Sequence, residues 1–173
     1  IADHNGPVYL RFGRPKVPNF THENFNFKIG KGIMLKEGKD VTIISTGHLV
    51  WESLEASKKL DEIGISAEVI NIHTIKPLDE EIIINSAKKT NAVVSAEEHN
   101  FLGGLGESIS RTLSINYPTP QEFVATDDTF GESGKPTDLM KKYGLDSDSI
   151  VKAVNKVIVR KKWRNIYLYF SCH

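Results

Sequence analysis

The sequence predicts an α/β fold, a three-layer α/β/α sandwich around a mostly parallel β-sheet. Short apolar segments rich in β-branched residues, such as residues 41–45, are typical of strands buried on both faces. They alternate along the chain with segments of helical periodicity, and the connections are short. Repetition of this kind implies right-handed crossovers, which place helices on both faces of a parallel sheet.

Five segments are expected to form the strands of this sheet: residues 31–35, 41–45, 67–72, 92–96 and 122–125. An earlier segment, residues 7–12, also alternates as a strand does. Pro15 and Pro18 follow it and cannot continue a ladder, because proline has no backbone N–H. This isolated segment is either the last strand of a preceding domain or an edge strand of the main domain.

Helices are expected at residues 49–63, 79–89 and 103–114, with two more at 136–143 and 147–159. The first places apolar residues near one face, and Gly64 ends it. Asp79, Glu80 and Glu81 put negative charge at the positive end of the second. The aromatic-rich residues 163–173 lack this periodicity. They are interpreted as an atypical extension or a stretch added for expression.

The composition is that of an ordinary globular protein. The 173 residues suffice for one domain with a core, and 22 basic residues balance 22 acidic ones. This balance argues against nucleic acid or an anionic membrane as a partner. A single cysteine, Cys172, excludes a disulfide framework within the chain, and no apolar run approaches the length of a membrane helix. We therefore expect a soluble, cytoplasmic protein.

Polar residues follow several of the expected strands. In a parallel sheet, ligands and partners gather beyond the carboxyl ends of the strands. Two interpretations are open: a metal site, or a polar loop edge that hydrogen-bonds neighbouring loops or a partner subunit. The spacing matches no zinc or iron signature, which favours the loop edge. The residues concerned are His48, His73, Glu97, Glu98, His99, Asp127 and Asp128.

Two further features suggest anion binding. The glycine-rich residues 103–106 fit neither a dinucleotide fingerprint nor a P-loop, so tight turning and close helix packing explain them better. Arg14 lies between Gly13 and Pro15 on a short rigid turn, and a guanidinium suits phosphate because its donors match two oxygens. A surface arginine is the commoner explanation of such a residue.

Several segments together resemble the transketolase family. Residues 6–15 (GPVYLRFGRP) resemble the end of the pyrimidine-binding domain of transketolase-type enzymes. Residues 71–81 (NIHTIKPLDEE), 97–106 (EEHNFLGGLG) and 127–134 (DDTFGESG) are similar to parts of the C-terminal domain. The last segment favours transketolases among their relatives, and the resemblance covers about residues 6–160.

The resemblance implies a five-stranded mixed sheet whose first strand, residues 31–35, is antiparallel. It divides the chain into the trailing end of a pyrimidine-binding domain with a linker (1–29), the C-terminal domain (30–160) and an atypical tail (161–173). The complete enzyme would use thiamine diphosphate and magnesium to move a two-carbon ketol unit between sugar phosphates. Arg14 matches the arginine that binds the substrate phosphate.

The family's catalytic glutamate and metal ligands belong to domains outside this chain. No catalytic, cofactor-binding or metal-binding residue is therefore expected here, and the fragment alone is expected to be inactive. Expected partners are a second copy, the thiamine-binding domains or subunit of the same enzyme, and sugar phosphates. The alternatives are the C-terminal domain of a deoxyxylulose-phosphate synthase or of a 2-oxoacid dehydrogenase β subunit, and a stand-alone interaction module. The turn around Arg14 argues against the dehydrogenase, whose substrates carry no sugar phosphate.

Overall fold

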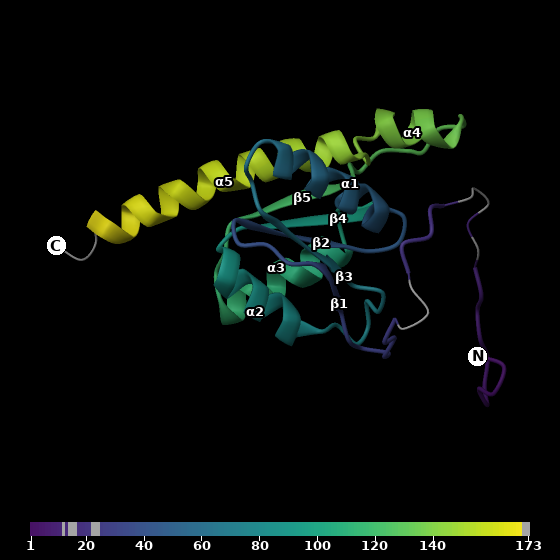
Figure 1. Cartoon of the computed structure of the whole chain (residues 1–173). Coiled ribbons are helices and arrows are strands. Elements are labelled where there is room, and N and C mark those ends of the chain that lie inside the picture. Colours follow the sequence, from purple (N-terminus) through teal and green to yellow (C-terminus); the bar gives the residue numbers. More distant parts are fainter. Residues whose placement is uncertain (12, 14–16, 22–24, 171–173) are drawn as a thin grey trace.

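Five strands form one mixed sheet in the order β1-β3-β2-β4-β5 in the computed structural model (Figure 1). β1 runs antiparallel to β3, and the other neighbouring strands are parallel. The predicted three-layer sandwich with an antiparallel first strand is thereby confirmed. The structure describes residues 1–11, 13, 17–21 and 25–170, and of residues 163–170 only the backbone. The strands are β1 (Ile33–Lys36), β2 (Val41–Ser45), β3 (Ala67–Asn71), β4 (Val93–Asn100) and β5 (Gln121–Thr126).

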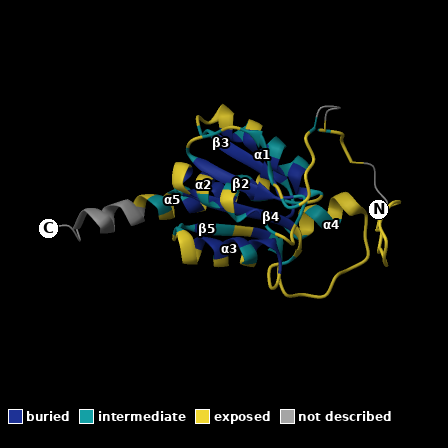
Figure 2. Ribbon diagram, turned by 90° about the horizontal axis from the view of Figure 1, so that it is seen from below, coloured by how far each residue is buried: buried dark blue, intermediate teal, exposed yellow. Residues whose placement is uncertain are grey.

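Helices cover both faces of the sheet (Figure 1). α1 (Leu49–Glu62) and α5 (Ser147–Phe170) pack on one face, and α2 (Glu80–Thr90) and α3 (Leu105–Asn116) on the other. The fifth helix, α4 (Pro136–Lys142), is short and buries none of its residues. Figure 2 shows the buried strands between these exposed outer surfaces.

Adjacent residues of one strand supply two separate cores. Ile43 of β2 packs in the cluster beneath α1 and α5, whereas Ile44 packs in the cluster with Ile83 and Ile109, beneath α2 and α3. Successive side chains of a strand point to opposite faces, so a doubly covered strand must be apolar throughout. All five residues of β2 are buried, as the predicted buried strand requires.

The connection between β1 and β2 lies against the start of β3. The backbone N–H groups of Lys39 and Asp40 both donate to the carbonyl of Ser66, at 3.1 and 2.9 Å. A Cβ on the preceding Gly38 would overlap the backbone of Ala67 and Glu68. Only glycine allows this close approach without displacing the start of β3.

Two expectations about the ends of the chain are wrong. Residues 7–11, the described part of the expected strand 7–12, pair with no strand, and β1 and β5 form the edges of the sheet. The segment is therefore not an edge strand of this domain over those residues. The helix predicted for residues 147–159 continues to Phe170 as α5, because no proline or glycine interrupts it. Its Arg160 and Lys161 donate to the carbonyls of Gln121 and Asp40, at 2.6 and 3.0 Å.

None of the helices formed by the described residues has both the length and the apolar character needed to cross a membrane.

Candidate functional site

The loops after the four parallel strands meet at one edge of the sheet. They comprise residues 46–48 after β2, 72–79 after β3, 101–104 after β4 and 127–135 after β5. We call this edge the carboxyl-end rim. Antiparallel β1 starts at the same edge, since Ile33 pairs with Asn71 at the end of β3. The chain therefore enters the sandwich beside the loops that carry the candidate polar residues.

The three histidines of the rim have separate local environments. His73 Nδ1 lies 2.9 Å from Thr74 Oγ1, and its ring centroid is 4.4 Å from that of Phe27 in the preceding linker. His99 Nδ1 is 2.8 Å from the carbonyl oxygen of Asn100, to which it can donate. His48 is the N-cap residue of α1, and its side chain makes no capping hydrogen bond. Within the described part of the chain, no three potential ligands are grouped around a point that could hold a metal ion.

Glu97 serves a different purpose from the metal ligand considered for it. Its carboxylate is buried, 4% exposed, and accepts the backbone N–H groups of Leu105 and Gly106 at 2.7 and 2.8 Å. These groups belong to the first turn of α3, where the helix dipole favours negative charge. A Cβ on Gly104 would overlap the same carboxylate. The glycine-rich segment thus receives a side chain of this protein where a nucleotide loop would receive a phosphate.

Other polar groups connect the rim loops to one another. The side-chain amide of Asn100 donates to Asp128 at 3.0 Å, and its carbonyl oxygen accepts the N–H of Leu102 at 2.9 Å. The N–H of Phe101 also donates to the carbonyl of Thr126 at 3.0 Å. The loops after β4 and β5 are therefore held side by side. Among these residues the arrangement supports the polar loop edge rather than the metal site.

Asp79 fastens the entry of the chain to α2. Its buried carboxylate accepts the N–H of Gly32 at 2.9 Å and that of Ile82 at 3.4 Å, and it lies 3.5 Å from the Lys31 ammonium. Lys31 also pairs with Glu81 at 3.2 Å. The hydrogen bond to Glu81, followed by the charge of Asp79, raises the pKa of Lys31 above its usual range. The direction in which the linker leaves the sandwich is set by these contacts.

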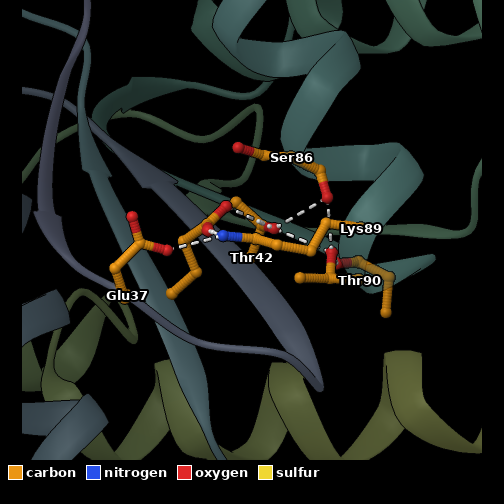
Figure 3. Close-up of polar contacts among 7 residues, drawn as sticks. Glu37, Thr42, Ser86, Lys89 and Thr90 are labelled. Atoms are coloured by element: carbon orange, nitrogen blue, oxygen red, sulfur yellow. Dashed lines mark hydrogen bonds and ion pairs between the residues drawn. The ribbon is translucent and has the colours of Figure 1, made fainter.

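A second polar cluster, missed in the sequence, lies at the opposite end of the sheet (Figure 3). Glu68 of β3 is fully buried, pairs with Lys89 of α2, and accepts the hydroxyl of Thr42 at 3.2 Å. Lys89 also pairs with Glu37 at 2.7 Å, and the hydrogen bonds to Glu37 and then Glu68 raise its pKa. The hydroxyls of Thr42 and Thr90 are 2.7 Å apart. A glutamate inside an apolar strand was the available signal, because buried carboxylates need a partner.

This cluster joins two strands, a helix and a loop through charges that neutralise one another. Glu68, Lys89 and Glu37 are all engaged in ion pairs, which is typical of a structural lock rather than of a reactive group. Arg14, the residue expected to bind phosphate, lies outside the described residues. Its placement at the site therefore stays a prediction.

Comparison with known proteins gives consistent matches. A family model described as transketolase, C-terminal domain, matches residues 30–150. The 6-deoxy-6-sulfo-D-fructose transketolase subunit of Clostridium sp. (strain MSTE9) is 45% identical over 164 residues, which cover 95% of this chain and 51% of that protein. One of the apulose-4-phosphate transketolase subunits of Phocaeicola vulgatus is 37% identical over 153 residues, 88% of this chain and 49% of its own.

Among solved structures, one described as a split gene transketolase, inactive beta4 tetramer, superposes with a TM-score of 0.83 at 44% identity. The match covers 86% of this chain and 48% of that one. The chain thus spans about half the length of the proteins that it matches.

Proposed function

Because this chain belongs to the transketolase family through its C-terminal domain, we propose that it supplies the assembly domain of a ketol-transferring enzyme. The complete enzyme would move a two-carbon unit between sugar phosphates. The observation that carries the proposal is the extent of the similarity. The 164 residues aligned with the Clostridium protein exceed the 144 from Gly30 to His173, so the alignment reaches into residues 1–29.

This extent supports the expected division of the chain. Residues 1–29 would be the trailing end of the pyrimidine-binding domain and a linker, residues 30–160 the C-terminal domain, and residues 161–173 an atypical tail. Two relatives are named as subunits, and the solved relative is described as a tetramer. We propose that this protein likewise associates with a second copy and with the thiamine-binding part of the same enzyme. The single cysteine fits a cytoplasmic setting.

Thiamine diphosphate and magnesium, which the family uses, do not fit the described residues of this chain. No group of three potential metal ligands occurs among them, and the start of α3 is filled by the carboxylate of Glu97. The cofactor would therefore be held by other parts of the complete enzyme. This chain's contribution would be to assembly and, through Arg14, to substrate binding.

Arg14 is proposed to hold the anionic end of the substrate. The names of the two relatives give one phosphorylated and one sulfonated ketose, and both carry a tetrahedral oxyanion. A guanidinium can donate to two oxygens of such a group. In the complete enzyme, Arg14→Ala should raise KM for a ketose phosphate roughly 10- to 100-fold, because hydrogen bonds to charged groups contribute about 1.5–3 kcal/mol. The kcat should change much less.

Steady-state kinetics with a ketose phosphate and the same ketose without its phosphate would measure this effect. KM for the unphosphorylated ketose should be nearly the same in wild type and variant. Arg11→Ala, three residues earlier, is the matched comparison. An unchanged KM in Arg14→Ala, or an effect confined to Arg11→Ala, would remove Arg14 from the site.

The function itself is tested with the complete gene product, supplied with thiamine diphosphate and magnesium. We expect ketol transfer from a ketose phosphate to an aldose phosphate, detected by product analysis, and none from the 173-residue chain alone. Absence of transfer by the complete protein across phosphorylated and sulfonated ketoses would refute the proposed function. Transfer by the isolated chain would refute its assignment as an assembly domain.

A further inference from the structure

The direction of β1 determines where the preceding polypeptide lies. β1 is antiparallel to its neighbour, so its first residue is at the carboxyl-end rim, and Asp79 holds Gly32 there at 2.9 Å. Anything that precedes Gly30 in the chain must therefore emerge on this side. Figures 1 and 2 both show the N-terminal segment on the side of the sandwich where α4 lies, away from the C-terminal end of α5.

Large apolar side chains are exposed on the same rim. Ile75 follows β3, Phe101 and Leu102 follow β4, and Phe130 follows β5. Phe130 is 98% exposed, more than any other large apolar side chain among the described residues. Because a protein gains little by leaving large apolar groups in water, such groupings mark surfaces that a partner covers. We call Ile75, Phe101, Leu102 and Phe130 the apolar rim residues.

The loop that carries Phe130 is held in place by its own contacts. The hydroxyl of Tyr143 accepts the N–H of Glu132 at 3.0 Å and lies 3.5 Å from the carbonyl oxygen of Phe130, and Lys142 pairs with Glu132 at 2.6 Å. At its start, Asp128 is tied to Asn100. None of these contacts buries the Phe130 ring. The loop is thus organised before any partner arrives, which lowers the entropic cost of docking.

From these observations we infer that the carboxyl-end rim is the docking face for the polypeptide that precedes Gly30 in the complete protein, with Phe130 as its central apolar anchor. The inference rests on the proposed function in taking this chain as part of a larger enzyme. The relatives are about twice as long as the matched part, which leaves material for such a domain. A domain joined by a short linker meets the rim at an effective concentration of roughly millimolar, ahead of an untethered second copy.

Photo-crosslinking in the complete protein tests the contact directly. Phe130→p-benzoylphenylalanine should form crosslinks to residues that precede Gly30, located by mass spectrometry. The same label at Ile63, which is 59% exposed after the last turn of α1, is the matched control and should not reach that part. Crosslinks from position 130 only to residues 30–173, as in docking of a second C-terminal domain, would overturn the inference, as would no crosslinks at all.

Hydrogen exchange provides a second measurement that does not need the label. In the complete protein, Phe130→Asp should speed amide exchange in residues 100–103 and 128–134 roughly tenfold or more, because burial of a phenylalanine is worth at least that factor. Ile63→Asp should leave those rates unchanged, and slow exchange in β2 shows that each variant is folded. Equal rates in wild type and Phe130→Asp would refute the docking role.

Ketol transfer is assayed on the same wild-type sample, so the two proposals can fail separately. Activity without crosslinks to the preceding polypeptide refutes the docking face and leaves the function standing. Crosslinks in a protein without ketol transfer support the docking face while refuting the function.

Discussion

Replacing Lys89 with methionine would remove the ammonium group that pairs with Glu68 while keeping a side chain of similar length. The Glu68 side chain is 0% exposed, whereas that of Lys89 is 40% exposed and also pairs with Glu37 at 2.7 Å. Thr42 would still donate to Glu68 at 3.2 Å. One neutral hydroxyl cannot replace a cation beside a fully buried carboxylate. The variant should therefore be clearly less stable than wild type.

The size of the effect follows from the burial of the partner left behind. Removing one member of a buried ion pair costs about 3–5 kcal/mol of unfolding free energy. Lys89 is partly in contact with water, so we expect the lower end, about 3 kcal/mol at pH 7. Glu37→Gln, which breaks only the outer pair, should cost less than about 1 kcal/mol. Urea unfolding of the 173-residue chain measures both, as a lower midpoint at unchanged m-value.

The second substitution Glu68→Leu should recover most of the loss in the Lys89→Met background, because it removes the unpaired charge. The raised pKa of Lys89 also gives a sign for pH. A raised lysine pKa adds stability that is full below the unfolded-state pKa and is lost as pH rises through the folded-state pKa. The gap between wild type and Lys89→Met should persist from pH 7 to 9 and narrow above about pH 10.5. A loss below about 1 kcal/mol, or no recovery in the double variant, would refute the reasoning.

Three further predictions concern other contacts. Glu97→Ala should cost about 2–4 kcal/mol in urea unfolding, since two N–H groups at the start of α3 lose a charged acceptor; a loss no larger than that of Glu107→Ala would contradict this. Gly38→Ala should cost about 3 kcal/mol or more by pushing a Cβ into the backbone of β3, whereas Gly131→Ala, with open space around it, should be nearly neutral; equal effects would disprove the steric argument. The hydrogen bond from Lys59 lowers the pKa of Asp148, so Lys59→Ala should raise that pKa toward its usual value in an NMR titration. In wild type, this carboxylate's contribution to stability is present above its unfolded-state pKa and is lost as pH falls through the lowered value.

The sequence was most informative where a segment is buried on both faces. The bounds of β2 agree with the predicted residues 41–45, because an apolar, β-branched run between turn residues has few other uses. The strand predicted for residues 92–96 continues to Asn100 as β4. Its last residues are polar, and their strand conformation depends on pairing with Thr126 across an irregular register. Pairing between distant segments has no signal in the local pattern.

The direction of β1 is a similar case. Its antiparallel orientation is an expectation from the family resemblance, because the periodicity of one strand is the same whichever way it runs. The structure confirms that orientation through the pairing of Ile33 with Asn71. The isolated strand expected at residues 7–12 illustrates the opposite outcome. Alternation makes a segment suitable for a strand, but its backbone groups need a neighbour, and residues 7–11 have none in this sheet.

By itself the sequence determined the order of strands and helices and the layers they form, because hydrophobic periodicity is a local property that each segment carries. The partners of the buried charges were decided only by the tertiary structure. Glu97 looked like one of several rim carboxylates until α3 folded back upon it, and Glu68 meets Lys89 only because β3 and α2 pack together. A buried charge must find a counterpart wherever the fold brings one within reach, and spacing along the chain does not reveal that distance.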